Sequence, residues 1–155
     1  MFEKFTEKAI DVVKSAQIHA IEFNHEKIYP EHLLLSLLND TNSLIVKTFS
    51  IHKLKIDDLK KDIEELLNKR AVVKPVEFVV FSDSSKDIFN RTLEIARVLG
   101  NSYVKPEHIF LAIWECPKLE LTAVLEEKGI DVDKMKAMFY NVLSANKLHR
   151  FGNCC

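Results

Sequence analysis

The chain has 155 residues, which is enough for one domain or for two fused halves. Lys and Arg number 22 and Asp and Glu number 23, so the formal net charge is −1, which argues against a dedicated nucleic-acid binder. Only three glycines and four prolines occur, too few for the tight turns of an all-β sandwich or barrel and without the spacing of a phosphate-binding loop. Length and composition therefore favour a soluble helical protein without a P-loop ATPase site.

The first predicted helix begins after Thr6. Apolar side chains recur with helical spacing from Phe5 to Phe23, which is typical of an amphipathic helix with one buried face. Thr6 precedes this stripe and is a candidate N-cap. A second helix is predicted from Pro30, because a first-turn proline lacks only an N–H that would be unpaired there. Glu31 then lies at the positive end of that helix.

Two further helices and a linker complete the first half of the chain. A short helix is predicted near residues 43–50 and another over about 57–69, the latter opened by Asp57 as a cap. Residues 53–70 include six basic and five acidic residues, which is typical of a solvated helix face. Residues 70–80 contain Pro75 and a β-branched run, so we expect an extended linker that packs against the helices.

The second half repeats the first. A shift of 76 positions places Phe5 on Phe81 (81 − 5 = 76) and aligns residues 28–35 with 104–111, so that Pro-Glu-His recurs. Ser82 and Glu107 take the places of Thr6 and Glu31. Helices are predicted after Ser82, from Pro106, near 119–128 and over about 133–145, the last opened by Asp133. The sequence therefore predicts an all-α, eight-helix pseudo-twofold duplicate: one domain over residues 1–147 (repeats about 1–70 and 81–147) and a flexible tail at 148–155.

Cysteines and apolar runs bear on location. Cys116, Cys154 and Cys155 are an odd set without a disulfide framework, which favours a reducing, cytoplasmic location. No apolar run approaches the ~18 residues of a membrane span, so no membrane partner is predicted. Neither metal-ligand spacing nor a nucleophile motif is found, so we predict no cofactor, no metal and no catalytic residue.

Two motifs and their second copies carry a resemblance to a known family. Phe5-Thr6-Glu7-Lys8-Ala9 and Pro30-Glu31-His32-Leu33-Leu34-Leu35 resemble the N-terminal substrate-receiving domain of the Clp ATPase unfoldases, and residues 1–6 are most similar to the ClpC branch. The resemblance covers about residues 1–145 and implies the double Clp-N motif fold. It also implies a domain without catalysis of its own that binds adaptor or substrate proteins for an ATP-dependent unfoldase or protease.

The ClpC branch further implies recognition of phosphorylated arginine at two pseudo-equivalent sites. The matching positions are Thr6 with Glu31, and Ser82 with Glu107. Each carboxylate would accept the N–H groups of a guanidinium, while hydroxyls and helix N-termini suit the phosphate. The same four residues also have a purely structural interpretation, as caps and first-turn acceptors.

Alternatives remain at this stage. His32 and His108 are interpreted as structural hydrogen-bonding residues. The chain could be a free-standing relative that docks on a Clp ATPase ring or Clp protease and modulates substrate loading. A helix-turn-helix nucleic-acid binder would need a basic recognition helix, and none of the predicted helices has a strong positive excess. A hydrolase assembled from dispersed Ser, His and Asp has no signature in the sequence.

Overall fold

A computed structural model describes residues 2–116 and 119–152 of the chain, with side chains up to residue 144. This part contains eight helices and two short strands, so the predicted all-α, eight-helix fold is confirmed. In chain order they are α1 (Glu7–Glu22), β1 (Lys27–Ile28), α2 (Pro30–Leu37), α3 (Leu44–Ile51), α4 (Ile56–Asn68), β2 (Val80–Phe81), α5 (Asp83–Val98), α6 (Pro106–Glu115), α7 (Glu120–Glu127) and α8 (Val132–Gly152).

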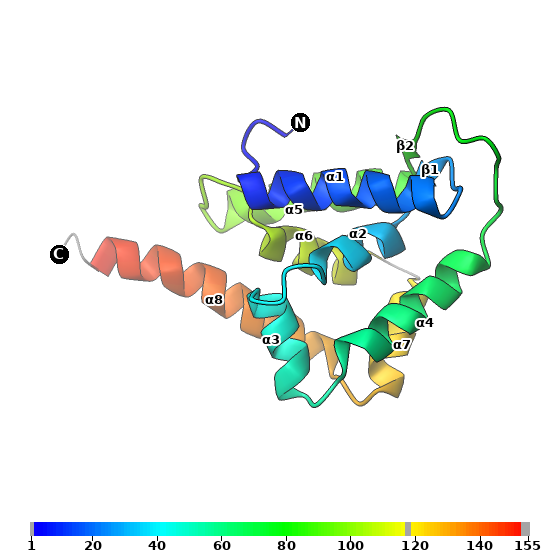
Figure 1. Cartoon of the computed structure of the whole chain (residues 1–155). Coiled ribbons are helices and arrows are strands. Elements are labelled where there is room, and N and C mark those ends of the chain that lie inside the picture. The colour runs from blue at the N-terminus through cyan, green and yellow to red at the C-terminus, as the bar shows by residue number, and fades with distance from the viewer. Residues whose placement is uncertain (1, 117–118, 153–155) are drawn as a thin grey trace.

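Helices α2 and α6 form the centre of the molecule. Helices α1 and α5 lie on one side of them, and α3, α4, α7 and α8 lie on the other (Figure 1). Every residue of α2 is buried, and in α6 the run from His108 to Trp114 is buried as well. A helix that is apolar on nearly all sides has to be covered on all sides, which explains why these two helices are central.

The backbone repeats with the same register as the sequence. Asn24 and Gly100 have φ of 58° and 69° just after α1 and α5, and Lys53 and Gly129 have φ of 60° and 86° just after α3 and α7. Each pair is separated by 76 positions (100 − 24 and 129 − 53). A residue in the left-handed region commonly ends a helix, so the two copies stop equivalent helices in the same way.

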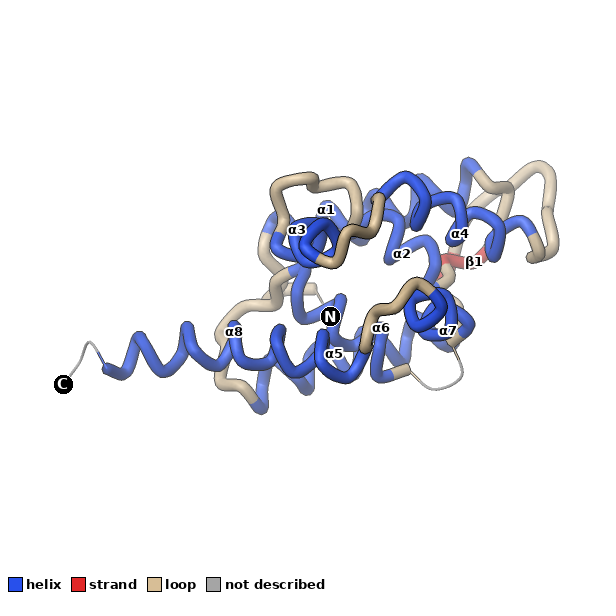
Figure 2. Tube along the Cα trace, turned by 90° about the horizontal axis from the view of Figure 1, so that it is seen from below, coloured by secondary structure: helices blue, strands red, loops and turns tan. Residues whose placement is uncertain are grey.

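The two repeats exchange their extended segments. Strand β1 pairs in parallel with β2, with Ile28 opposite Phe81, and an isolated parallel bridge joins Phe5 to Val104. Phe5 is equivalent to Phe81 and Ile28 to Val104, so the segment before the first helix of each repeat pairs with the segment before the second helix of the other. Figure 2 shows β1 as a short red segment among the helices. These strands were not predicted.

Helices α1 and α5 begin as predicted. The Thr6 hydroxyl accepts a hydrogen bond from the Ala9 backbone N–H at 3.1 Å. The Ser82 hydroxyl accepts one from the Ser85 N–H at 3.1 Å. Both hydroxyls therefore satisfy first-turn donors that the helix itself cannot pair.

The predicted aspartate caps of α4 and α8 are wrong. The N-cap of α4 is Lys55, whose side chain makes no capping hydrogen bond, and Asp57 lies inside the first turn. At the start of α8 the Lys134 N–H donates to Asp131 Oδ1 at 3.1 Å, so Asp131 caps in place of Asp133. An aspartate in the first turn still complements the helix dipole, which explains why both positions looked like helix starts.

The linker is mostly exposed, so the prediction that it packs against the helices holds only in part, at residues such as Val79 that pack against the core. Val72 and Phe78 are 57% and 73% exposed, and only Val73, Val76 and Val79 are half-buried. Backbone hydrogen bonds anchor it, from Val73 N–H to the Asn24 carbonyl at 2.8 Å and from β2 to β1. Between these anchors the linker extends away from the helices (Figure 1).

Helix α8 continues to Gly152, beyond the predicted end near residue 145. The backbone of residues 148–152, which we expected in a flexible tail, is therefore helical. Cys154 and Cys155 lie outside the described residues. Within residues 2–116 and 119–152, no helix has both the length and the apolar character needed to cross a bilayer.

Candidate functional site

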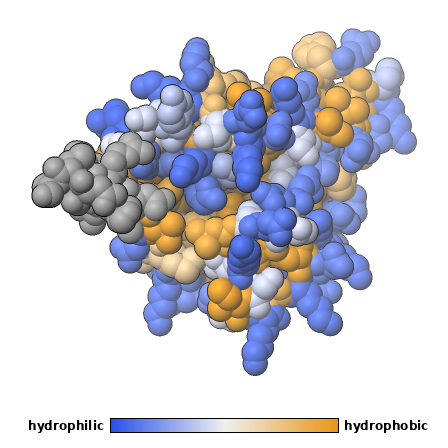
Figure 3. All heavy atoms as spheres, turned by 60° about the vertical axis from the view of Figure 1, so that its left-hand side comes forward, coloured by the Kyte–Doolittle hydropathy of each residue, from blue (hydrophilic) through white to orange (hydrophobic). Residues whose placement is uncertain are grey.

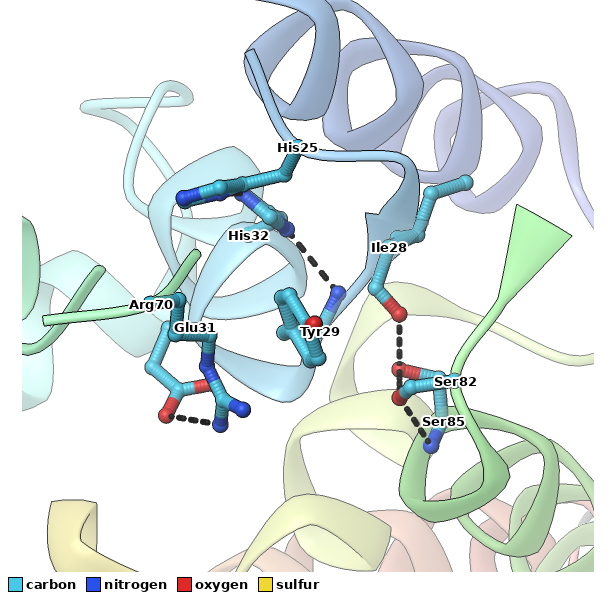
Figure 4. Close-up of polar contacts among 8 residues, drawn as sticks. All are labelled: His25, Ile28, Tyr29, Glu31, His32, Arg70, Ser82 and Ser85. Atoms are coloured by element: carbon cyan, nitrogen blue, oxygen red, sulfur yellow. Dashed lines mark hydrogen bonds and ion pairs between the residues drawn. The ribbon is translucent and has the colours of Figure 1, made fainter. Parts of the chain in front are cut away.

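Ser82 connects the first turn of α5 to strand β1. Its backbone N–H donates to the Ile28 carbonyl at 3.1 Å, and its hydroxyl donates to the Ser85 hydroxyl at 3.1 Å. The Ser85 hydroxyl in turn donates to the same Ile28 carbonyl at 2.7 Å (Figure 4). Both serines are buried. The segment beside Ser82 is therefore the one before α2, which comes from the other repeat, and not the segment that carries Glu107.

Thr6 occupies the equivalent place against the second repeat. Its backbone N–H donates to the Val104 carbonyl at 3.0 Å, so it lies beside the start of α6. Thr6 and Glu107 line the same pocket. The predicted pairs, Thr6 with Glu31 and Ser82 with Glu107, are therefore wrong, because the exchanged strands bring each hydroxyl to the other repeat.

This pocket has a volume of 940 Å³ and lies where the N-termini of α1, α3 and α6 meet. Its lining includes Thr6, Lys8, Ser43, Lys105 and Glu107. Glu107 is half-buried, and it has no ion-pair partner among the described side chains. The first turns of three helices therefore lie around one opening, and its lining also includes two lysines and four carboxylates: Lys8, Lys105, Glu7, Asp11, Asp40 and Glu107.

Glu31 is held very differently. Its side chain is 6% exposed, and its Oε1 accepts a hydrogen bond from Arg70 Nη2 at 3.1 Å. The Arg70 guanidinium carbon lies 3.7 Å from the centroid of the Tyr29 ring. In Figure 4 the Glu31 carboxylate points toward Arg70 and away from Ser82. The structure therefore does not bring Ser82 and Glu31 together as a site, and Arg70 is not part of the solvated face expected for residues 53–70.

His32 lies three residues into α2 and connects its N-terminus to the loop after α1. Its Nδ1 accepts from the Tyr29 N–H at 2.9 Å, so its Nε2 carries the proton and donates to His25 Nδ1 at 3.1 Å. Burial and the neighbouring His25 lower the pKa of His32 to about 3. Burial also lowers the pKa of His25.

His108 has the same role in the second repeat. Its Nδ1 accepts from the Lys105 N–H at 2.9 Å, and its Nε2 faces the Asn101 side-chain oxygen at 2.9 Å. Burial lowers the pKa of His108 to about 4. Both histidines are fully buried and neutral, so they stabilise the helix starts, as the structural interpretation of these residues predicted.

One polar cluster at the end of α6 was not predicted from the sequence. Arg91 Nε and the Tyr140 hydroxyl donate to the two carboxylate oxygens of Glu115. Burial alone would raise the pKa of Glu115, but these two hydrogen bonds and the charge of Arg91 lower it overall. Burial and the hydrogen bond to Glu115 raise the pKa of Tyr140 to about 12. The cluster therefore ties α5, α6 and α8 together.

Features of a catalytic or metal site were not found in the part of the chain that the structure describes. Burial raises the pKa of the Cys116 thiol, which disfavours the thiolate that a nucleophile needs. Among the described residues, no group of three or more His, Cys, Asp or Glu side chains could hold a metal ion.

Comparison with known proteins gives a consistent result. Residues 4–128 match the family model of the Clp repeat (R) N-terminal domain. The chain is 28% identical over 146 residues to the chloroplastic chaperone protein ClpC1 of Arabidopsis thaliana, covering 94% of this chain and 16% of that protein. It therefore spans about a sixth of that relative's length.

Solved structures share the fold. The Hsp104 N-terminal domain from Candida albicans superposes with a TM-score of 0.78 at 22% identity, covering 90% of this chain and 91% of that one. A ClpV N-domain in complex with a VipB peptide superposes with a TM-score of 0.69 at 20% identity, covering 91% of this chain and 88% of that one.

Proposed function

Because the chain belongs to the family of Clp repeat N-terminal domains, we propose that it recruits substrates or adaptor proteins to a Clp-type ATP-dependent unfoldase or protease, as a protein-binding domain without catalysis of its own. The ClpV N-domain, which has the same fold, binds a VipB peptide. In this chain, apolar surface lies between hydrophilic side chains on the face shown in Figure 3. Ile18 and Ile21 of α1 and Val98 of α5 are also large apolar residues with exposed side chains. Such surfaces suit a protein partner.

We further propose that the Thr6–Glu107 pocket recognises a phosphorylated arginine side chain. The observation that carries this proposal is the meeting of three helix N-termini around Glu107, which has no ion-pair partner among the described side chains. The N–H groups and the positive ends of the helix dipoles favour a phosphate, and Lys105 adds positive charge, whereas Lys8 already pairs with Asp40 at 4.0 Å. Glu107 can accept charge-assisted hydrogen bonds from a guanidinium. One pocket thus offers both charges that phosphoarginine requires.

The test is calorimetric titration of free phosphoarginine into the wild type and into the variant Glu107→Gln. Loss of a charge-assisted partner costs about 1.5–3 kcal/mol, so we expect affinity to fall by roughly 10- to 150-fold. Glu120→Gln is the matched control, because Glu120 is an exposed first-turn glutamate of another helix and lies outside the pocket. The control should bind like the wild type.

Two results would contradict this recognition. The absence of binding heat in the wild type would remove phosphoarginine as the ligand and leave adaptor or apolar-segment binding as the function. Unchanged affinity in Glu107→Gln would remove the pocket as the site. We keep the cytoplasmic location as a prediction, and cell fractionation distinguishes it from the chloroplast location of the ClpC1 relative.

A further inference from the structure

Arg70 holds the Glu31 carboxylate by two contacts of different kinds. The guanidinium donates to Glu31 Oε1 at 3.1 Å, and its central carbon lies 3.7 Å from the centroid of the Tyr29 ring. A carboxylate and an aromatic face are the two groups that proteins commonly use to bind the guanidinium of a partner's arginine. The place where an external guanidinium would bind is therefore filled by the chain's own arginine (Figure 4).

The contact leaves part of the carboxylate unused. Glu31 Oε2 is buried and receives no hydrogen bond from the described residues. Arg70 donates through Nη2 to one oxygen, whereas an arginine in a bidentate fork donates to both. A buried acceptor without a donor is costly, so a better-oriented guanidinium at this place would gain a hydrogen bond that Arg70 does not make.

Arg70 is also placed where it can leave. Its side chain is 36% exposed, and it is the first residue after the C-cap of α4. The linker that follows is mostly exposed and is anchored by the backbone hydrogen bond from Val73 to Asn24. Moving Arg70 out of the site therefore uncovers little apolar core.

The equivalent place in the second repeat is open. Lys105 stands where Tyr29 does, and Glu107 has no ion-pair partner among the described side chains. The two glutamates have the same sequence context, yet one is filled from within the chain and the other faces a pocket of 940 Å³. The pseudo-twofold symmetry of the fold does not extend to these two sites.

We propose that Arg70 is an internal guanidinium ligand that closes the Glu31 site, so that a partner's arginine binds there only after displacing it. This inference rests on the proposed function, because it concerns the same class of guanidinium ligand. The domain then binds one such ligand, at Glu107, until the start of the linker moves. Displacement lowers the apparent affinity of the closed site by the fraction of molecules in which Arg70 is away.

The experiment uses two probes. Methylguanidinium tests the Glu31 site without any phosphate, and phosphoarginine tests the pocket of the proposed function. In Arg70→Ala, we expect methylguanidinium to raise the melting temperature and to bind at least about tenfold more tightly than in the wild type. The double variant Arg70→Ala/Glu31→Gln should lose this gain. Phosphoarginine should bind the wild type with a stoichiometry of one, at the Glu107 pocket.

Controls separate a local effect from a loss of folding. Lys69→Ala removes the adjacent exposed charge but leaves the contact, so it should behave like the wild type. Arg70→Gln is a second variant that opens the site with a polar side chain in place, and circular dichroism checks that each variant is folded. The inference is overturned if the Arg70 variants bind methylguanidinium no better than the wild type. Absent phosphoarginine binding in the wild type, together with the methylguanidinium gain, would instead reject the proposed function alone.

Discussion

The two buried histidines should make the fold sensitive to mild acid. His32 and His108 each have a folded pKa, about 3 and about 4, below the unfolded value of 6.5. The unfolded chain therefore binds protons between these values that the folded chain does not. Their contribution to stability is complete above pH 6.5 and is lost as the pH falls toward the folded values.

The size of the effect follows from these values. At pH 5 an unfolded histidine with a pKa of 6.5 is almost fully protonated, while the folded one is almost fully neutral. Proton linkage then removes about 2 kcal/mol per histidine between neutral pH and pH 5, or ~4 kcal/mol for the two. That is a large share of the ~5–15 kcal/mol by which domains are usually stable.

The assay is urea unfolding at pH 7, 6 and 5, followed by circular dichroism, for the wild type and for His32→Gln/His108→Gln. Glutamine at this helix position can still accept from the N-cap N–H but does not titrate, so the double variant should lose about 4 kcal/mol less than the wild type on going to pH 5. His52→Gln changes an exposed histidine and should keep the wild-type pH dependence. If the double variant loses as much stability as the wild type, the buried histidines are not the source of the acid sensitivity.

Three further predictions concern stability at neutral pH, measured by chemical denaturation. Gly129→Ala should lower the free energy of unfolding by about 1 kcal/mol, because a Cβ there meets nothing within 4 Å but φ is +86°, which strains a residue with a side chain. Lys53→Gly, at the equivalent position, relieves such strain and should stabilise by about 0.5–1 kcal/mol. If both variants changed stability in the same direction, this explanation would be wrong. Tyr140→Phe removes a donor from Glu115 and should cost about 1 kcal/mol, and a neutral result would mean that water replaces the hydroxyl. Ser85→Ala removes the buried hydroxyl that donates to β1 and should lower the free energy of unfolding by about 1–2 kcal/mol. The same substitution at an exposed serine should leave stability unchanged.

Helix positions were predictable because their signals are local. The stripe from Phe5 to Phe23, the cap at Thr6 and the proline at Pro30 each depend on neighbours within a few residues. The pairing of Thr6 with Glu107 could not be predicted from the sequence. The repeat shows which positions are equivalent, but contacts within a copy and contacts exchanged between copies fit the same alignment, so the sequence could not choose between them.

Arg70 shows the same limit at the level of one side chain. It ends a stretch rich in both basic and acidic residues, where nothing nearby in the sequence distinguishes it from the other basic residues, and its partner Glu31 is 39 positions away. A usable signal did exist for the histidines. His25 with His32 and Asn101 with His108 have the same spacing of seven and the same place in each repeat, which indicates a repeated polar contact.

The exchanged strands also set the order in which a newly made chain can become structured. Phe5 leaves the ribosome early, but the residue it pairs with, Val104, follows almost one hundred residues later. The segment at the start of the first repeat therefore stays unpaired while the second repeat is synthesised. Ile28 and Phe81 are closer in the chain, so we expect β1 and β2 to pair first. The segment that contains Phe5 should pair last, after the second repeat has been synthesised.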